Sequence, residues 1–170
     1  MNNGDQHAAQ ARQLLAGTFR AVMSTHSLEH PGYPFGSVVP YMLDRQGLPL
    51  LLLSHLSQHT RNVDADGRCG LTVAASGDGD VQQLARLSAI GQMTRIDPDP
   101  GVAHYFDYFP QSRMYFEQLG FHFYRFNAER FHWNAGFATA RWFGASRIVR
   151  ANPLDADRVR RICTHMNDDH

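Results

Sequence analysis

The sequence predicts an α+β fold that is mainly β: a small antiparallel barrel with helices set outside it. Short apolar stretches joined by turn residues are typical of strands connected as hairpins. Helical periodicity is confined to the two ends of the chain and to one aromatic stretch in its middle. No GxGxxG sequence follows an apolar run, so nothing indicates the doubly wound sheet of a dinucleotide-binding domain.

The first half of the chain is expected to contain one helix and at least three strands. Apolar residues recur at helical spacing over 8–23, after a polar and loose tail at 1–7, and the end of this helix can run into a strand. Pro40 places the next strand at a sheet edge or a bulge. Four consecutive leucines, 50–53, indicate a strand buried on both faces. The expected segments are strands at 35–43, 50–53 and 69–75, a hairpin turn at 44–47 and a flexible turn at 76–80.

The second half is expected to contain more strands, two short helices and a closing helix. Residues 97–100 open an aromatic-rich helical stretch through 105–109, and Pro110 precedes a second helix that ends near Leu119. The expected remaining segments are strands at 84–94, 121–126 and 129–137, and a helix at 155–166 within a C-terminal segment at 152–170.

Composition limits the class of protein. A chain of 170 residues with 43% hydrophobic residues suits one domain, 1–170, with a sizeable core. Its 16 basic and 16 acidic residues balance, so the charge favours neither nucleic acid nor a membrane as a partner. Every basic residue is arginine, a bias typical of GC-rich bacterial genomes, which excludes Schiff-base and Walker-type lysines. Cys69 and Cys163 lie far apart, and no signal peptide or long apolar segment is evident, so a reduced cytoplasm is expected.

The segment directly after the leucine strand is rich in groups that can hold an anion. The first amides of a helix are unpaired, its dipole favours negative charge, and an arginine fork matches phosphate or carboxylate oxygens. The alternative is an ordinary serine cap with a solvated first turn. The candidate residues are Ser54, Ser57, Gln58, His59, Thr60, Arg61 and Asn62.

Several blocks of the sequence together resemble one known family. The blocks are ARQLLAGTFRAVMST (11–25), YPFGSVVPY (33–41), LSHLSQHTRNVDADGRCGL (53–71), LARLSAIGQMTRI (84–96), GFHFYRFNAER (120–130) and HMNDDH (165–170). Through them the chain resembles the pyridoxamine-phosphate-oxidase-like FMN-binding split barrels, and within these the HugZ/HutZ haem-utilisation branch. The block at 53–71 and HMNDDH are the most specific parts.

Three departures from the family pattern limit what the resemblance implies. NAGFA at 134–138 stands where the family usually has a glycine-rich turn. Many relatives continue past the HMNDDH block. The lysine that pyridoxamine-phosphate oxidases use for the flavin phosphate is missing, which argues against that activity itself.

The resemblance implies an antiparallel split β-barrel with flanking helices that forms a homodimer, with cofactor pockets across the dimer interface. It places the anion-holding residues of 54–62 on one rim of such a pocket and the strand at 33–41 on a wall. The cofactor would be haem or, alternatively, FMN, held through its propionates or its phosphate. Arg86 is a second candidate for this rim, and its alternative is an exposed arginine on a strand face.

HMNDDH provides the candidate haem ligand. The resemblance implies that His170 is the axial ligand of the haem iron, with His165 as the second choice. Asp168, Asp169 or a residue near Glu129 of a second subunit could orient the ligating ring. The alternative is that these histidines only decorate the end of a terminal helix.

Other candidate sites have weaker support. His55 and His59 have a metal-binding spacing if both are helical, but no third ligand is evident. The aromatic residues of 105–116 and the tryptophans of 131–143 suit core and dimer packing better than a cofactor cover. No order of residues typical of covalent hydrolysis is recognisable.

Three functions follow from this resemblance. The first is a haem-utilisation protein that binds haem at the dimer cleft and supports its oxidative degradation with an unidentified reductant. The second is an FMN-binding oxidoreductase that uses the 54–62 rim for the flavin phosphate. The third is a haem or flavin carrier with the same site and no turnover.

Overall fold

The N-terminal apolar stretch is divided between a helix and a strand. In the computed structural model, which describes residues 3–78, 80–99, 102–136 and 139–151, α1 spans Asn3–Gly17 and β1 spans Arg20–His26. The helix thus begins within the segment expected to be a loose tail. The end of the expected helical stretch is a strand, as anticipated, and two residues separate the end of α1 from the start of β1. The buried residues of α1 are Ala8, Ala11 and Leu15, which form one helical face against the core.

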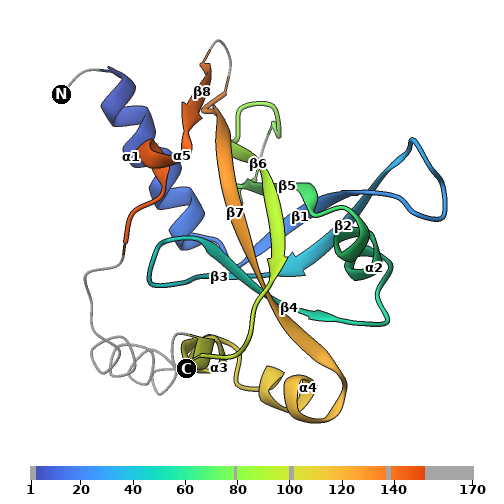
Figure 1. Cartoon of the computed structure of the whole chain (residues 1–170). Helices are drawn as coiled ribbons and strands as arrows, with labels where there is room; N and C mark the ends of the chain where they lie inside the picture. The colour runs from blue at the N-terminus through green and yellow to red at the C-terminus, as the bar shows by residue number, and fades with distance from the viewer. Residues whose placement is uncertain (1–2, 79, 100–101, 137–138, 152–170) are drawn as a thin grey trace.

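One antiparallel sheet, curled into a half-barrel, forms the body of the molecule (Figure 1). The strands are hydrogen-bonded in the order β2-β1-β5-β6-β7-β4-β3, and β8 pairs with β7. β2 is an edge strand that ends at Pro40, which confirms the expectation from this proline. The strands after β1 are β2 (Pro34–Pro40), β3 (Met42–Leu43), β4 (Pro49–Ser54), β5 (Arg68–Ala74), β6 (Arg86–Arg95), β7 (Phe121–Asn134) and β8 (Ala140–Gly144).

The leucine strand β4 is buried on both faces, as predicted. Leu51 and Leu53 belong to the larger core, which α1 also covers. Leu50 and Leu52 belong to a second core on the opposite face, together with Phe123 of the paired strand β7. Because side chains alternate along a strand, four consecutive leucines can supply two cores at once.

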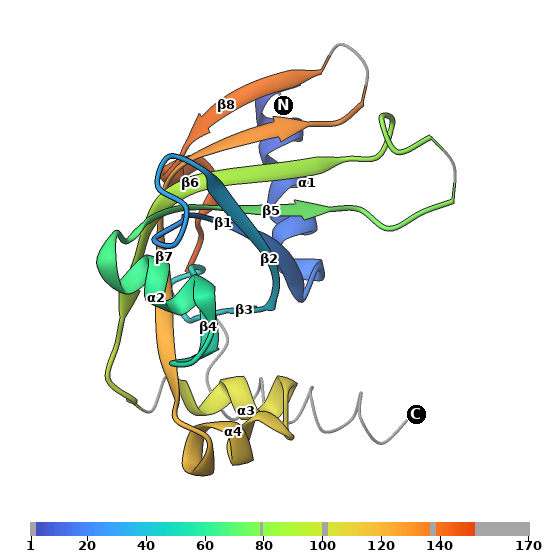
Figure 2. The ribbon, with the colours of Figure 1, turned by 90° about the vertical axis from the view of Figure 1, so that its right-hand side faces the viewer.

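The remaining helices cover separate parts of the sheet. α2 (Gln58–Ala65) follows β4 and packs against β1 and β2. The helices η1 (Val102–His104), α3 (Tyr105–Tyr108) and α4 (Ser112–Gln118) form a group at one end of β4 and β7 (Figure 2). Tyr105 and Phe106 of this group are buried in the second core, which confirms the prediction that the aromatic stretch packs in the core.

The structure differs from expectation in the second half of the chain. The strands expected at 121–126 and 129–137 are one continuous strand, β7. A register shift places Ile90 opposite Arg130 and Gly91 opposite Ala128, so Glu129 is accommodated as a bulge and pairing continues past it. Neither β8 nor the short helix α5 (Ala145–Ile148) was expected. The expected helix at 155–166 and the segment at 152–170 lie outside the described residues.

None of the helices in the described part of the chain is long and apolar enough to span a membrane.

Candidate functional site

A pocket of about 310 Å³ lies where the ends of β2 and β4 meet the start of α2 and the α3–α4 group. This volume is at the lower end of the range for small-molecule sites. One end of the pocket is polar and formed by the turn after β4. The start of α4 adds Gln111 and Ser112, and the remaining lining residues are aliphatic or aromatic. The lining residues are Val38, Val39, Pro40, Leu52, Leu53, Ser54, Ser57, His59, Tyr105, Phe109, Gln111, Ser112, Tyr115 and Phe121.

The polar end of the pocket arises from how β4 changes into α2. Ser54 is the last residue of the strand, and its Oγ accepts a hydrogen bond from the amide of Leu56 at 3.3 Å. Ser57 is the N-cap residue of α2, but its side chain makes no capping hydrogen bond. The helix therefore begins at the pocket without the usual side-chain cap on its first amides.

His59 is the only ionisable side chain of this polar end. Its Nδ1 lies 3.0 Å from the Oγ of Ser37 on β2, so the ring is fixed between two elements. Burial lowers the pKa of His59 below its ordinary value, because desolvation penalises the imidazolium. The neutral ring is therefore the dominant form at pH 7.

Thr60 and Asn62 are placed in the interior of the fold and do not line the pocket. Both residues are 0% exposed. The Asn62 amide donates to Thr25 Oγ1 at 2.8 Å, and its oxygen accepts from the amide of Leu28 at 3.1 Å and from Gln58 at 2.9 Å. Asn62 thus connects α2 to β1 and to the loop that follows β1.

Gln58 and Arg61 lie on the exposed side of the same helical turn. The Arg61 guanidinium donates to the carbonyl of Leu56 at 2.8 Å, to Glu29 at 3.2 Å, and to the side chain of Gln58. It is not among the pocket-lining residues. To bind an anionic ligand, Arg61 would have to exchange its exposed partner Glu29 for that ligand.

Arg86 is not brought together with this cluster within one chain. It begins β6 at the end where the strand pairs with Ala74, whereas α2 follows the β4 end of the sheet. Its guanidinium donates to the carbonyls of Val81, Gln82 and Leu84, which closes the turn before β6.

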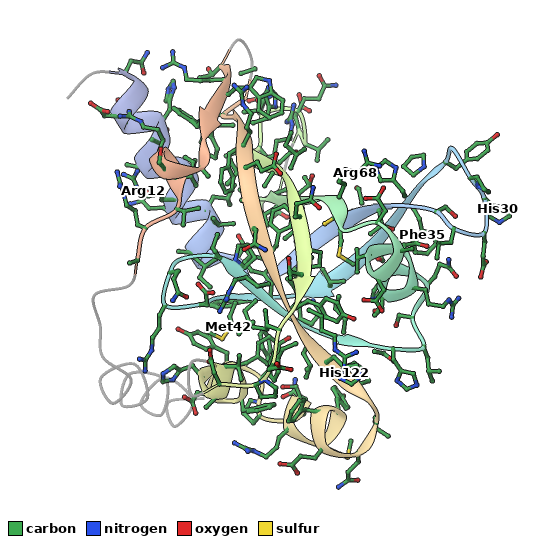
Figure 3. The ribbon with its side chains drawn as sticks, in the orientation of Figure 1. Arg12, His30, Phe35, Met42, Arg68 and His122 are labelled. Atoms are coloured by element: carbon green, nitrogen blue, oxygen red, sulfur yellow. The ribbon has the colours of Figure 1, made fainter. Side chains whose placement is uncertain are left out.

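The candidate iron ligands His165 and His170, with Asp168 and Asp169, lie outside the described residues. Glu129 is exposed on the bulge of β7. Among the described residues, no group of three or more His, Cys, Asp or Glu side chains is arranged to hold a metal ion. His55 donates a hydrogen bond from Nδ1 to the carbonyl oxygen of Gly120 at 2.8 Å. Its ring centroid lies 6.4 Å from that of His122, which is labelled in Figure 3.

Several lining residues were not individually predicted. Gln111 and Ser112 reach the pocket because α4 starts directly after Pro110, a position that sequence periodicity does not relate to β4. Tyr105, Phe109 and Tyr115 come from the aromatic stretch, so this stretch contributes to the pocket wall as well as to the second core. Of the two tryptophans, Trp133 is buried in the larger core and Trp142 is half exposed.

A larger and more open hollow, of about 540 Å³, lies between the end of α1 and the end of β5. Arg20 is the only ionisable residue in its lining, and no histidine faces it. It lacks a cluster of functional groups comparable to that beside α2.

Comparison with known proteins identifies the family. A family model described as CREG, beta-barrel matches residues 2–151. The chain belongs to the CREG beta-barrel family. The resemblance to the split-barrel proteins and to their haem-utilisation branch is thereby confirmed, together with the split-barrel fold class.

Relatives of this CREG-family chain carry haem-related names. An Arabidopsis thaliana protein named "Non-canonical heme oxygenase HOZ, chloroplastic" is 26% identical over 170 residues, which cover 95% of this chain and 52% of that protein. The chain therefore spans about half the length of this curated relative. A solved heme binding protein from Mycobacterium smegmatis is 25% identical, with a TM-score of 0.75 over 96% of this chain and 69% of that one.

The similarity to a third protein supports only the fold of this chain. HutZ from Vibrio cholerae, described as a heme storage protein, is 18% identical, with a TM-score of 0.59. The match covers 73% of this chain and 91% of HutZ.

Proposed function

We propose that this chain binds haem in the pocket beside α2 and supports its oxidative degradation. The observation that carries the proposal is the neutral character of the pocket. None of the lining residues is Arg, Asp or Glu, and burial keeps His59 neutral. A flat, largely apolar macrocycle suits such a wall and can keep its two singly charged carboxylates at the edge of the pocket, whereas a doubly charged phosphate taken inside the same wall without a cation would be strongly disfavoured. The haem-related names of the two relatives at 25% and 26% identity support the same choice.

The polar end of the pocket suits the carboxylate edge of such a ligand. Ser54, Ser57 and His59 offer neutral hydrogen-bond donors next to the first amides of α2. Gln58 and Arg61 stay candidates for the exposed rim, where a propionate would compete with Glu29 for the guanidinium. In this proposal Thr60 and Asn62 hold α2 in place and do not contact the ligand. Arg86 could contact a ligand only in the pocket of a second subunit.

A homodimer would complete the pocket. The exposed face of the sheet carries one row of side chains across six strands, and Val38 is 71% and Trp142 51% exposed at its two ends. Val38 also belongs to the pocket wall, so a second copy that covered this row would extend over the pocket opening. The row consists of Val38, Val22, Thr72, Ser88, His132 and Trp142.

His170 is proposed as the axial ligand of the haem iron, with His165 as the second candidate. Haem would supply the iron and oxygen chemistry, and the chain would supply the ligand, the pocket and its electrostatics. Electrons would come from a reductant that the chain does not specify, and the proposed setting is the cytoplasm. A carrier without turnover would use the same residues, so product formation with a reductant separates carrier from enzyme.

The ligand proposal is tested by substituting each histidine separately. We expect His170→Ala to shift the Soret and ligand-field bands of the haem complex and to slow haem degradation, because the iron loses its imidazole. His165→Ala serves as the matched control and should leave both unchanged. Identical spectra and affinities for wild type and His170→Ala would remove His170 from the site.

The flavin alternative rests on the same pocket and the same helix start. It predicts that the chain is purified with a flavin absorption spectrum and that haemin does not displace the flavin. A haem spectrum and no retained flavin would exclude it.

A further inference from the structure

The pairing of Ser37 with His59 connects the edge strand to the pocket. Ser37 lies on β2 and is half-buried, and His59 is the second residue of α2. Their side chains are in hydrogen-bond contact at 3.0 Å, through the Oγ of Ser37 and the Nδ1 of His59. Neither side chain makes another hydrogen bond within the described part of the chain, so each is oriented mainly by the other.

This contact determines which part of the imidazole ring is available to a ligand. Because Nδ1 is turned to Ser37 and the ring lines the pocket, the edge that carries Nε2 is left for the ligand. A serine hydroxyl can accept from Nδ1–H or donate to a bare Nδ1, and in the second arrangement the neutral ring carries its proton on Nε2 and is a donor toward the pocket.

The surroundings of the ring favour such a neutral donor. Burial disfavours the imidazolium form of His59. The neighbouring pocket residues Ser54 and Ser57 are neutral donors as well, and the nearest arginine of the helix, Arg61, is engaged by Glu29. A ligand oxygen at this end would thus be held by neutral hydrogen bonds.

We propose that Ser37 is a positioning residue that fixes His59 as a neutral Nε2–H donor to a carboxylate oxygen of the bound ligand. The inference deepens the proposed function, on which it rests for the identity of the ligand. The inference adds Ser37, which lies outside the predicted rim at 54–62, and assigns a specific role to His59, which lies within that rim. The ligand class is a flat molecule with a carboxylate at its edge.

The first test needs no ligand. Nitrogen chemical shifts of ¹⁵N-histidine-labelled chain report which ring nitrogen of His59 is protonated. We expect the Nε2–H tautomer in wild type and in Ser37→Thr, which keeps the hydroxyl, and a mixture of tautomers in Ser37→Ala. The same tautomer population in all three would overturn the role of Ser37, and matching thermal unfolding midpoints would show that the variants are folded.

The second test uses haemin as the probe. His59→Ala should weaken haemin binding about tenfold, since it removes a hydrogen bond to a charged group. Ser37→Ala should weaken it about threefold to fivefold, the equivalent of a typical neutral hydrogen bond, and Ser37→Thr should restore it. Unchanged affinity in Ser37→Ala despite an altered tautomer would overturn the ligand contact. Failure of wild type to bind haemin would instead overturn the proposed function, and the tautomer test would still decide the role of Ser37.

Discussion

At the scale of single residues, the start of α2 separates side chains that face the pocket from side chains that hold the helix in place. Asn62 belongs to the second group because its amide makes three hydrogen bonds inside the fold. Thr60 is equally buried, but its hydroxyl has no hydrogen-bond partner among the described residues. Asn62 and Thr60 are therefore a matched pair of buried residues, one with hydrogen-bonded side-chain atoms and one without.

Asn62→Ala should lower the free energy of unfolding by about 1–3 kcal/mol, because buried partners lose their hydrogen bonds. Thr60→Val removes a hydroxyl that is not satisfied and nearly keeps the volume, so stability should be unchanged or slightly raised. Denaturant unfolding of both variants measures the difference. Equal losses of stability would contradict the assignment, as would a loss of haemin affinity in Asn62→Ala at unchanged stability.

The sequence indicated the helix start and its polar composition, but it could not separate these two groups. All seven candidate residues of 54–62 have hydroxyl, amide, imidazole or guanidinium side chains that suit an anion. Which of them face the pocket depends on how α2 packs against β1 and β2, and this packing is a tertiary property. Ser37 was missed for the same reason, since nothing in its own segment relates it to His59.

At the scale of helices and strands, the sequence predicted correctly those segments whose local residue pattern is distinctive. Four leucines between Pro49 and Ser54 predicted a doubly buried strand, and the structure confirms it. Asn127 and Ala128 instead suggested a break, because they separate the strands expected at 121–126 and 129–137. The break is a bulge against β6, and its signal in the sequence is Gly91 on the partner strand.

Gly91 allows the two longest strands to stay paired at this bulge. A Cβ at Gly91 would collide with backbone atoms of Asn127 and Ala128, which cannot move without disturbing β7. Gly91→Ala should therefore lower the free energy of unfolding by about 1–3 kcal/mol. Hydrogen exchange should show the loss of protection in β6 and β7 first.

Gly17→Ala is the matched control for this prediction. Gly17 ends α1, and apart from its chain neighbours and the backbone of its own helix no atom lies within 4 Å of the position of an added Cβ. The substitution should be neutral or stabilise by about 0.4–1 kcal/mol, because alanine reduces the entropy of the unfolded chain. A similar destabilisation by both substitutions would contradict the role given to Gly91.

At the scale of the whole molecule, the proposed pocket requires a second copy of the chain over the exposed row of the sheet. Sedimentation should give twice the 19.2 kDa mass of one chain. Val22→Asp places a charge within this row, beside Val38, and should shift the chain towards monomer, since a buried unpaired charge is costly. Leu119→Asp, at a similarly exposed leucine beyond α4, should leave the dimer intact. A monomeric wild type at micromolar concentration would contradict the dimer.

In the proposed function, the neutral pocket beside α2 selects haem over flavin. The most direct measurement is the titration of the apo-chain with haemin and, separately, with FMN, each followed by its absorption spectrum. We expect saturable haemin binding at one equivalent per chain, weakened by His59→Ala, and FMN binding that is much weaker or not measurable. Tight, saturable binding of FMN that haemin does not displace would contradict this selection.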